Sequence, residues 1–293
     1  MSEPETYTLT TPTAEIAYDV RRNEASTEPP LLLVGSPMGA AGFTSLAQHF
    51  TDRTLVTYDP RGAERSRRTD GATQSTPDEH ADDIGRVIDA VGGTVDLFAS
   101  SGGAVNALAL VAKQPEKVRT LVAHEPPAAQ VLPDREAALA ASKAVADAYQ
   151  AGGTGPGMAK FIALVMLKGE VPSDWADQAA PDPAMFGLPT EDDGSRDDVM
   201  LAQNMITCTH YEHDFDAIRD ASTRVVLAAG VESEGELAHR AAQGVAERLG
   251  TGCVIFPSNH GGFLGGEYGQ TGEPEAFAVK LREVLEHAAI TAA

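Results

Sequence analysis

Short apolar runs alternate along most of the chain with longer segments whose apolar residues recur every three or four positions. Residues 31–34 form a continuous apolar run, which is typical of a strand buried on both faces of a parallel sheet, and residues 118–123 are expected to form another apolar strand. Between such runs, residues 77–91 keep the spacing of an amphipathic helix, with Thr76 as its N-cap and Pro77 in its first turn. This alternation predicts an α/β fold built on a mostly parallel sheet.

The same reasoning places the other elements of the sheet and the helices around it. Weak alternation over residues 5–20 predicts a hairpin of edge strands. Further strands are expected at residues 54–58, 95–98, 224–230 and 252–257. Further helices are expected at residues 43–50, 105–113 and 273–289, together with a helix that ends at Leu249.

One long segment, residues 128–215, interrupts the alternation of strands and helices. Its helical stretches are expected at residues 135–150, 157–167 and 196–211, and links rich in Gly, Pro and Asp join them. We find no convincing strand pattern there, so the sequence predicts an all-helical insertion.

A cluster of small residues follows the strand expected at 95–98 and comes directly before a helix-prone run. A strand that turns sharply into a helix strains its central residue and leaves no room for bulky neighbours two positions away. With Ser101 at the centre those neighbours are Ala99 and Gly103, whereas Ser100 would have Phe98 as a neighbour. Steric fit therefore favours Ser101 as the central residue.

Composition and charge exclude several classes of partner. The formal net charge is −21 and no basic patch is present, so binding to nucleic acid or to an anionic membrane is not expected. No apolar run approaches the ~18 residues that span a bilayer, and the acidic start of the chain is unlike a secretory signal. We expect a cytoplasmic protein.

Two distant cysteines exclude a disulfide framework, and neither a metal nor a cofactor is expected.

Three segments together resemble the α/β-hydrolase family. Residues 99–103 are similar to its nucleophile elbow, G-x-S-x-G, with Ala99 in the first small position. The small-residue loop after residues 31–34 is similar to the family's oxyanion loop, although Val34 replaces a histidine. Residues 59–66 resemble its D-x-R-G-x-G-x-S segment, which implies a structural role for Asp59 and Arg61.

The resemblance implies a fold and a division of the chain. The fold is a mostly parallel eight-stranded sheet flanked by helices, with an all-helical cap. Residues 1–127 and 216–293 would form the core, and residues 128–215 would form the cap. Residues 158–166 contain apolar side chains that could line a substrate pocket or pack against the core.

The resemblance also implies catalytic residues. Ser101 would be the nucleophile, and His260, in a glycine-flanked loop after the last strand, would be its base. Backbone N–H groups of Gly102 and Ser36 would hold the oxyanion, since Pro37 has no N–H; Met38 is the second candidate on that loop.

The acid of the triad is less constrained, because a serine, Ser233, occupies the position where the family commonly has an aspartate. Some relatives carry a glutamate after the strand that follows the elbow helix, and Glu125 matches that position. We favour Glu125 over Glu232, with Glu234 third.

The remaining histidines give weaker signals. His49, His80, His239 and His287 lie on predicted helices and are expected at the surface. His210 and His213 have the spacing of a metal pair on a helix, but a solvated helix end is the favoured interpretation.

The function implied is that of a serine hydrolase acting on a carboxylic ester through an acyl-enzyme, with a small, apolar ester as substrate. Amidase, lactonase, C–C hydrolase and perhydrolase chemistry remain alternatives. So does a non-catalytic protein that binds a small ligand on the same scaffold. The sequence leaves the oligomeric state open.

Overall fold

A mixed sheet forms the centre of the computed structural model, which describes residues 3–290, with side chains up to residue 286. Eight strands follow one another across the sheet in the order β1-β2-β4-β3-β6-β7-β8-β9, and the two-residue β5 (Arg67–Arg68) pairs with β2. The eight strands are β1 (Glu5–Thr10), β2 (Ala14–Arg21), β3 (Leu31–Val34), β4 (Leu55–Tyr58), β6 (Val95–Ser100), β7 (Val118–His124), β8 (Arg224–Gly230) and β9 (Cys253–Phe256). All pairs from β4 to β9 are parallel, while β2 is antiparallel to β1 and β4.

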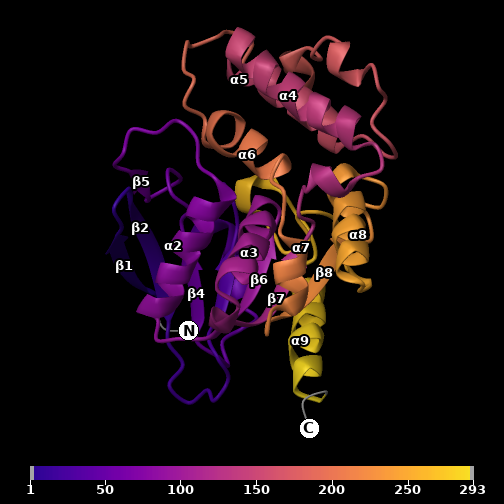
Figure 1. Cartoon of the computed structure of the whole chain (residues 1–293). Coiled ribbons are helices and arrows are strands. Elements are labelled where there is room, and N and C mark those ends of the chain that lie inside the picture. The colour runs from indigo at the N-terminus through magenta and orange to yellow at the C-terminus, as the bar shows by residue number, and fades with distance from the viewer. Residues whose placement is uncertain (1–2, 291–293) are drawn as a thin grey trace.

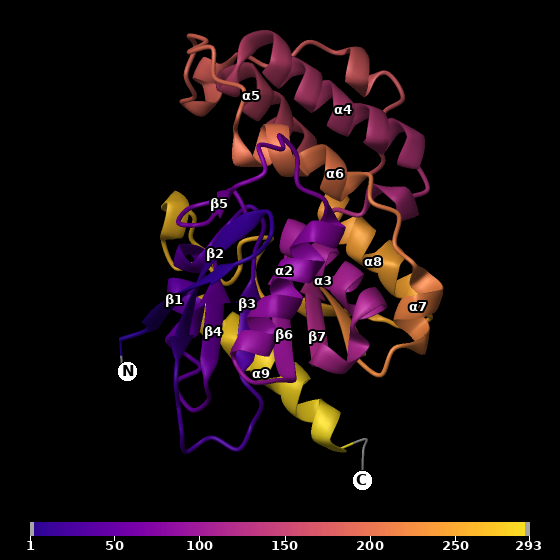
Figure 2. The ribbon, with the colours of Figure 1, turned by 60° about the vertical axis from the view of Figure 1, so that its left-hand side comes forward.

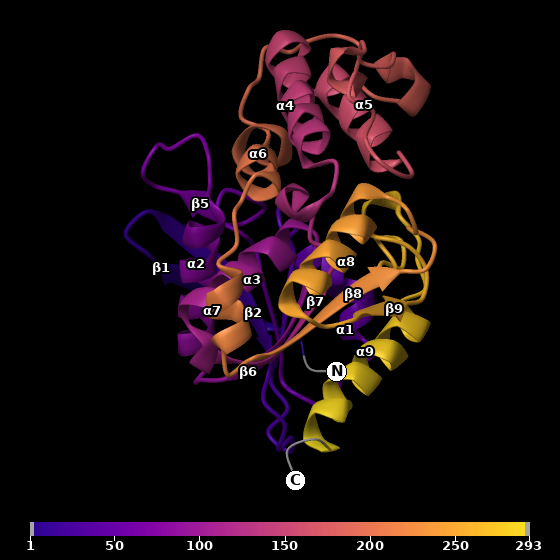
Figure 3. The ribbon, with the colours of Figure 1, turned by 45° about the vertical axis from the view of Figure 1, so that its right-hand side comes forward.

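Helices cover both faces of this sheet (Figures 2 and 3). One face packs against α2 (Pro77–Ala90), α3 (Gly102–Lys113), α7 (Phe215–Asp220) and α8 (Leu237–Leu249), and the other packs against α1 (Thr44–Ala47) and α9 (Pro274–Ile290). Successive side chains of a strand point to opposite faces, so Leu32 joins the first layer while Leu31 and Leu33 join the second. Because helices cover both faces, all four residues of β3 are buried, which explains why this strand is a continuous apolar run.

A group of helices stands above the carboxyl ends of the parallel strands (Figure 1). These are α4 (Arg135–Gly152), α5 (Thr154–Val165) and α6 (Met205–Thr209), the last preceded by a π-helical segment at Val199–Asn204. They share an apolar cluster that includes Val145 and Tyr149 and continues onto Leu237 and Ala241 of α8. The assignment of residues 128–215 as a separate cap domain stays a prediction.

Most predicted elements are present, with some differences in extent. The capping box at Thr76 is formed, because its hydroxyl accepts from the Glu79 N–H and the Glu79 carboxylate accepts from the Thr76 N–H. The helix expected at 43–50 is shorter: residues 48–50 make i→i+3 bonds, which tighten the chain beyond α1. The sequence did not predict α7 or β5.

Short 3-10 helices occur at Ala40–Phe43, Pro115–Lys117, Ala129–Val131, Trp175–Asp177, Pro183–Phe186 and Glu267–Gly269. Among residues 3–290, no helix combines the length and the hydrophobicity needed to cross a membrane.

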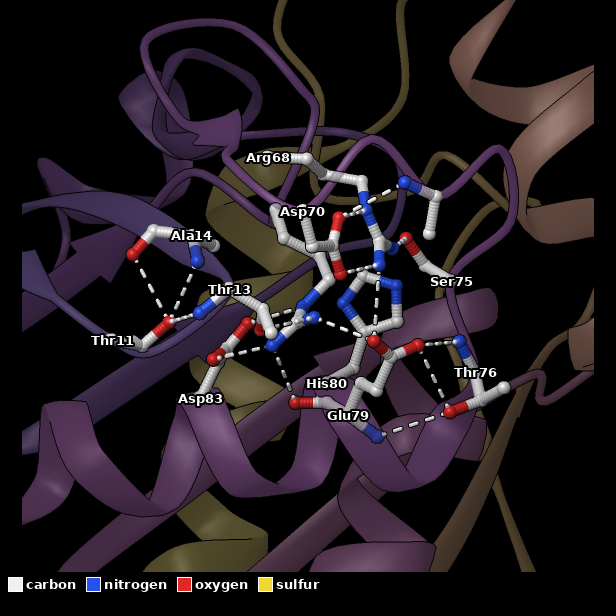
Figure 4. A network of polar contacts seen from close by, with 12 residues as sticks. Thr11, Thr13, Ala14, Arg68, Asp70, Ser75, Thr76, Glu79, His80 and Asp83 are labelled. Atoms are coloured by element: carbon white, nitrogen blue, oxygen red, sulfur yellow. Dashed lines mark hydrogen bonds and ion pairs between the residues drawn. The ribbon is translucent and has the colours of Figure 1, made fainter.

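A buried ionic network braces the loop after β4. The Arg61 guanidinium donates to both oxygens of Asp83, at 2.7 and 2.9 Å, and to Glu79 at 2.7 Å. Figure 4 shows the carboxylates of Asp83 and Glu79 converging on this region from α2, with Arg68 beside them. Asp59 accepts from the Ala40 N–H at 2.8 Å and so ties this loop to the one after β3. These contacts support the structural role expected for Asp59 and Arg61.

Candidate active site

Ser101 forms the bend between β6 and α3. Its backbone has φ 56° and ψ −129°, a conformation that is strained for any residue with a side chain. Its N–H donates to the carbonyl of His124 on the neighbouring strand β7 at 2.9 Å, which holds the bend in place. A Cβ atom at Gly103 would lie 2.6 Å from the Val34 carbonyl, so this position accepts only glycine. Partly exposed, the Ser101 side chain stands at the carboxyl edge of the sheet.

The loop after β3 lies directly beside this bend. A Cβ atom at Gly102 would lie 2.7 Å from the carbonyl oxygen of Ser36, so the two backbones are nearly in contact. Gly102 is the first residue of α3, where N–H groups lack an intrahelical acceptor and the helix dipole favours negative charge. The structure therefore brings together the two residues expected to bind an oxyanion.

Glu125 and His260 meet at the same edge of the sheet. Glu125 directly follows β7, and its positive φ of 48° belongs to a backbone region that non-glycine residues rarely adopt. Its carboxylate is fully buried, and Oε2 lies 2.5 Å from Nδ1 of His260, in the loop after β9. The His260 side chain is 41% exposed, so this pair connects a buried carboxylate with accessible space.

The contact defines the proton positions on His260. A carboxylate only accepts hydrogen bonds, so Nδ1 of His260 carries the proton and Nε2 of the neutral ring has a free lone pair. Burial would raise the pKa of Glu125, but the hydrogen bond and charge of His260, with further help from His124 and Ser233, lower it to about 2. Burial also disfavours the charged form of His260, yet the hydrogen bond and charge of Glu125 raise its pKa above the ordinary 6.5. Glu125 is therefore ionised, and His260 holds its proton to a higher pH than an ordinary histidine does.

Two further residues support Glu125 on its other oxygen. The Ser233 hydroxyl and the Gly230 N–H both donate to Oε1, the latter at 2.8 Å. His239 Nδ1 lies 3.0 Å from the Gly230 carbonyl, which requires a proton on that nitrogen. Its Nε2 then accepts from the Gln243 amide at 3.2 Å. The Ser233 hydroxyl also lies 3.0 Å from the Gly230 carbonyl, but it has a single proton, and its contact with the Glu125 carboxylate is the shorter of the two.

Sequence reasoning did not assign Ser233 or His239 to the site. Ser233 was noted only as the residue in place of an expected aspartate, and the prediction that His239 is at the surface is wrong. A signal for His239 exists in the sequence, since it lies three and seven positions before Ala242 and Ala246 on the buried face of α8.

The other two acid candidates lie away from His260. Glu232 and Glu234 are exposed on the loop after β8. The Glu232 carboxylate accepts from the Ser258 hydroxyl at 3.4 Å. Within the described residues, the carboxylate that His260 contacts is that of Glu125.

Several remaining histidines are buried rather than exposed. The surface prediction for His80 is wrong, because its Nε2 meets the Asn204 amide oxygen at 2.7 Å inside the protein. His213 is also buried, which contradicts its expected place at a solvated helix end. His124 is buried among aromatic rings beneath His260, and desolvation lowers its pKa to about 4. The side chain of His287 lies outside the described residues. Among the residues with described side chains, no group of three or more His, Cys, Asp or Glu could hold a metal ion.

Comparison with known proteins agrees with this architecture. Residues 29–217 match the family described as alpha/beta hydrolase fold. An uncharacterized hydrolase, YraK of Bacillus subtilis (strain 168), is 28% identical over 95% of both chains. Proline iminopeptidase of Mycobacterium smegmatis superposes with a TM-score of 0.63 at 20% identity, covering 99% of this chain and 100% of the other. A thermophilic esterase of Thermogutta terrifontis superposes with a TM-score of 0.61 at 17% identity, and the superposition covers 98% of this chain and 99% of the esterase. The family match spans well over half of the sequence, and the chain belongs to the alpha/beta hydrolase fold family.

Proposed function

We propose that this protein hydrolyses carboxylic esters through an acyl-enzyme on Ser101. The observation that carries the proposal is the 2.5 Å contact between buried Glu125 and His260, at the sheet edge where strained Ser101 also lies. A serine hydroxyl is a weak nucleophile at neutral pH and needs an adjacent base, which in turn needs an orienting acid. Ser101, His260 and Glu125 supply these three roles.

The reaction has two halves. In the first, Ser101 Oγ attacks the ester carbonyl carbon while His260 Nε2 takes the hydroxyl proton. The backbone N–H groups of Gly102 and Ser36 stabilise the negative oxygen of the tetrahedral intermediate. His260 then gives its proton to the leaving alcohol, and the acyl group stays on Ser101. In the second half, His260 removes a proton from water as the water oxygen attacks the acyl-enzyme carbonyl. His260 then returns that proton to Ser101 Oγ as the bond to the acyl group breaks and the acid is released.

Glu125 supports both halves without exchanging a proton. Its negative charge stabilises the imidazolium that forms on His260 in each half, and its hydrogen bond keeps Nε2 directed at the reacting atoms. The donors on Oε1, the Ser233 hydroxyl and the Gly230 N–H, keep the buried carboxylate ionised and fixed. We therefore propose Ser233 as a positioning residue for Glu125.

A small, apolar substrate is supported by what covers the bend. Cys208 of α6 is buried, and its sulfur lies 3.3 Å from where a Cβ of Gly102 would be. The cap thus places an uncharged thiol, whose pKa burial raises to about 12, over the first turn of α3. We propose residues 128–215 as a cap domain that sets substrate choice, with esters preferred over the amide, lactone, C–C bond and peracid alternatives.

Hydrolysis of p-nitrophenyl butyrate by purified variants tests the proposal. Ser101→Ala should lose all turnover above background, because no other hydroxyl occupies the bend. Ser100→Ala is the matched control: its hydroxyl faces buried His124 at 3.4 Å, and we expect most activity to remain. Full activity in Ser101→Ala would exclude this mechanism, and inactive wild-type protein would favour a protein that only binds a ligand.

A further inference from the structure

Arg135 and Arg248, both exposed, are two of the four arginines in the described residues that lack a carboxylate partner, whereas most arginines of this acidic chain have one. Arg65, Arg119 and Arg240 each hold at least one acid. Within the described residues, the guanidinium groups of Arg135 and Arg248 make no hydrogen bond or ion pair. Their lack of partners is unexpected in a chain with 43 acidic and 22 basic residues. Arg135 is also the first residue of α4, where the helix dipole disfavours positive charge.

Both arginines line one pocket of about 210 Å³, which we call the hinge pocket. Gln130 and Arg135 reach it from the segment that runs from β7 into α4. Tyr211 and His213 reach it from the segment that returns from α6 to α7, while Arg248 comes from the last turn of α8. The hinge pocket therefore lies between the two connections of the helical cap and the core.

His213 gives a second, independent indication of a ligand. Its side chain is only 8% exposed and lines the pocket, yet neither ring nitrogen has a hydrogen-bond partner within the described residues. The rings of Tyr211 and Phe215 pack against it, with centroids 5.0 and 5.8 Å away. A buried polar group without a partner is costly. Each ring nitrogen exposes less than 1 Å² in this structure, so the ring has to rotate before its N–H can reach a ligand in the pocket. Desolvation lowers the pKa of His213 to about 4, so the neutral ring has one N–H to donate at pH 7.

The charge of the lining favours an anion. Arg135 and Arg248 face one acid in the lining, Glu212, so the pocket is positive on a protein whose formal net charge is −21. A guanidinium presents its N–H groups as a planar fork that matches the oxygens of carboxylate and phosphate. We propose that the hinge pocket binds a small ligand through an oxyanion group, phosphate or carboxylate, held by Arg135, Arg248 and the His213 N–H.

Such a ligand would join both cap connections to α8 and so limit movement of the cap relative to the core. This site is separate from the proposed chemistry at Ser101. Its test therefore measures binding alone, and the result does not depend on whether the protein is an esterase.

Isothermal titration calorimetry with inorganic phosphate and with succinate tests the site, at pH 7 and at constant ionic strength set with sodium chloride. Wild-type protein should bind at least one of the two saturably, and Arg135→Gln and Arg248→Gln should each raise the Kd at least tenfold. Arg67→Gln is the matched control: this exposed arginine pairs with Glu15 on the edge of the sheet, and its loss should leave the Kd unchanged. Saturation should also shift the ring signals of His213 in a ¹⁵N–¹H NMR spectrum.

Each outcome has a defined meaning. Binding of phosphate alone or of succinate alone supports the site and identifies the preferred group, and binding of both supports the shared chemistry. Absence of saturable binding by both overturns the proposal. So does binding that survives in the Arg135→Gln/Arg248→Gln variant, or an unshifted His213 at saturation. Unfolding of the ligand-free variants should match wild type, because neither arginine has a partner to lose.

Discussion

Two fully buried carboxylates, Asp83 and Glu125, differ in the partners that neutralise them. Both carboxylate oxygens of Asp83 accept hydrogen bonds from Arg61, which is 2% exposed and permanently charged. In Glu125, one carboxylate oxygen accepts hydrogen bonds from the Ser233 hydroxyl and the Gly230 N–H. The other contacts His260, whose side chain is 41% exposed. The cations of the first network are guanidinium groups, among them the partly exposed Arg86 at 3.5 Å from Asp83, and the network holds the loop after β4 in place. The second network ends in an imidazole, which gains and loses a proton and reaches accessible space.

The difference shows why burial and pairing alone do not identify a catalytic carboxylate. Both networks place charge in the interior, and both satisfy it with hydrogen bonds. What separates them is the partner: a guanidinium keeps its proton at any working pH, whereas an imidazole exchanges its proton. We therefore expect substitutions at Asp83 to change stability and substitutions at Glu125 to change activity.

Among the substitutions that distinguish the two networks, Glu125→Gln should cause the largest change in activity. The amide removes the negative charge that stabilises the His260 imidazolium and favours the wrong tautomer of the ring. We expect kcat/KM for an aryl ester to fall by about 10³- to 10⁴-fold. Glu232→Gln is the control, because that exposed carboxylate does not contact His260, and it should retain near wild-type kcat/KM. A large loss in Glu232→Gln with a small loss in Glu125→Gln would reverse the assignment of the acid.

Asp83→Asn should destabilise the protein without changing its chemistry. Breaking a buried ion pair by removing one partner costs about 3–5 kcal/mol, since the Arg61 charge is left without its main partner. Urea unfolding should show this loss, while kcat of the folded fraction should stay close to wild type. If kcat fell as far as in Glu125→Gln, the two networks would not be separate in function.

Ser233→Ala should have a smaller effect that is confined to kcat. Loss of one hydrogen bond to a buried charge leaves Glu125 less well held, and we expect about a tenfold decrease in kcat with little change in KM. Ser258→Ala provides a matched control, because its buried hydroxyl bonds Glu232 instead. Equal effects in the two variants would argue against a positioning role for Ser233.

The pH dependence gives the smallest and most specific signal. His260 must be neutral to act as a base, so kcat/KM should rise with pH through a midpoint above 6.5, because Glu125 raises the pKa of His260. The sign for stability is opposite. Since the folded pKa is the higher one, the contribution of His260 to stability is fully present below pH 6.5 and is lost as pH rises through the folded value. A midpoint at or below 6.5 would show that Glu125 does not act on His260 in solution.

Much of the fold follows from the sequence, because apolar runs and helix caps are local signals. The central strands, the capping box at Thr76 and the bend at Ser101 are each determined by a few neighbouring residues. The third helix expected within residues 128–215 was less predictable, since a π-helical segment precedes α6 within the single helix expected there.

The side-chain partners of the site were harder to predict. The choice between Glu125 and Glu232 depends on the backbone at Glu125, whose φ of 48° turns the side chain inward, and no local pattern encodes that angle. His80 and His239 sit on amphipathic helices, but their partners are Asn204 and the Gly230 carbonyl, in other elements. Such contacts are set by tertiary packing, which a one-dimensional pattern does not contain.

The most direct test of an activated Ser101 is reaction with a fluorophosphonate probe, followed by peptide mapping with mass spectrometry. The activated hydroxyl should attack phosphorus and displace fluoride, which adds one phosphonyl group to Ser101. Labelling should be lost in Ser101→Ala and strongly slowed in His260→Ala. A native protein that stays unlabelled, or one labelled at Ser100 or elsewhere, would contradict the proposal that His260 activates Ser101.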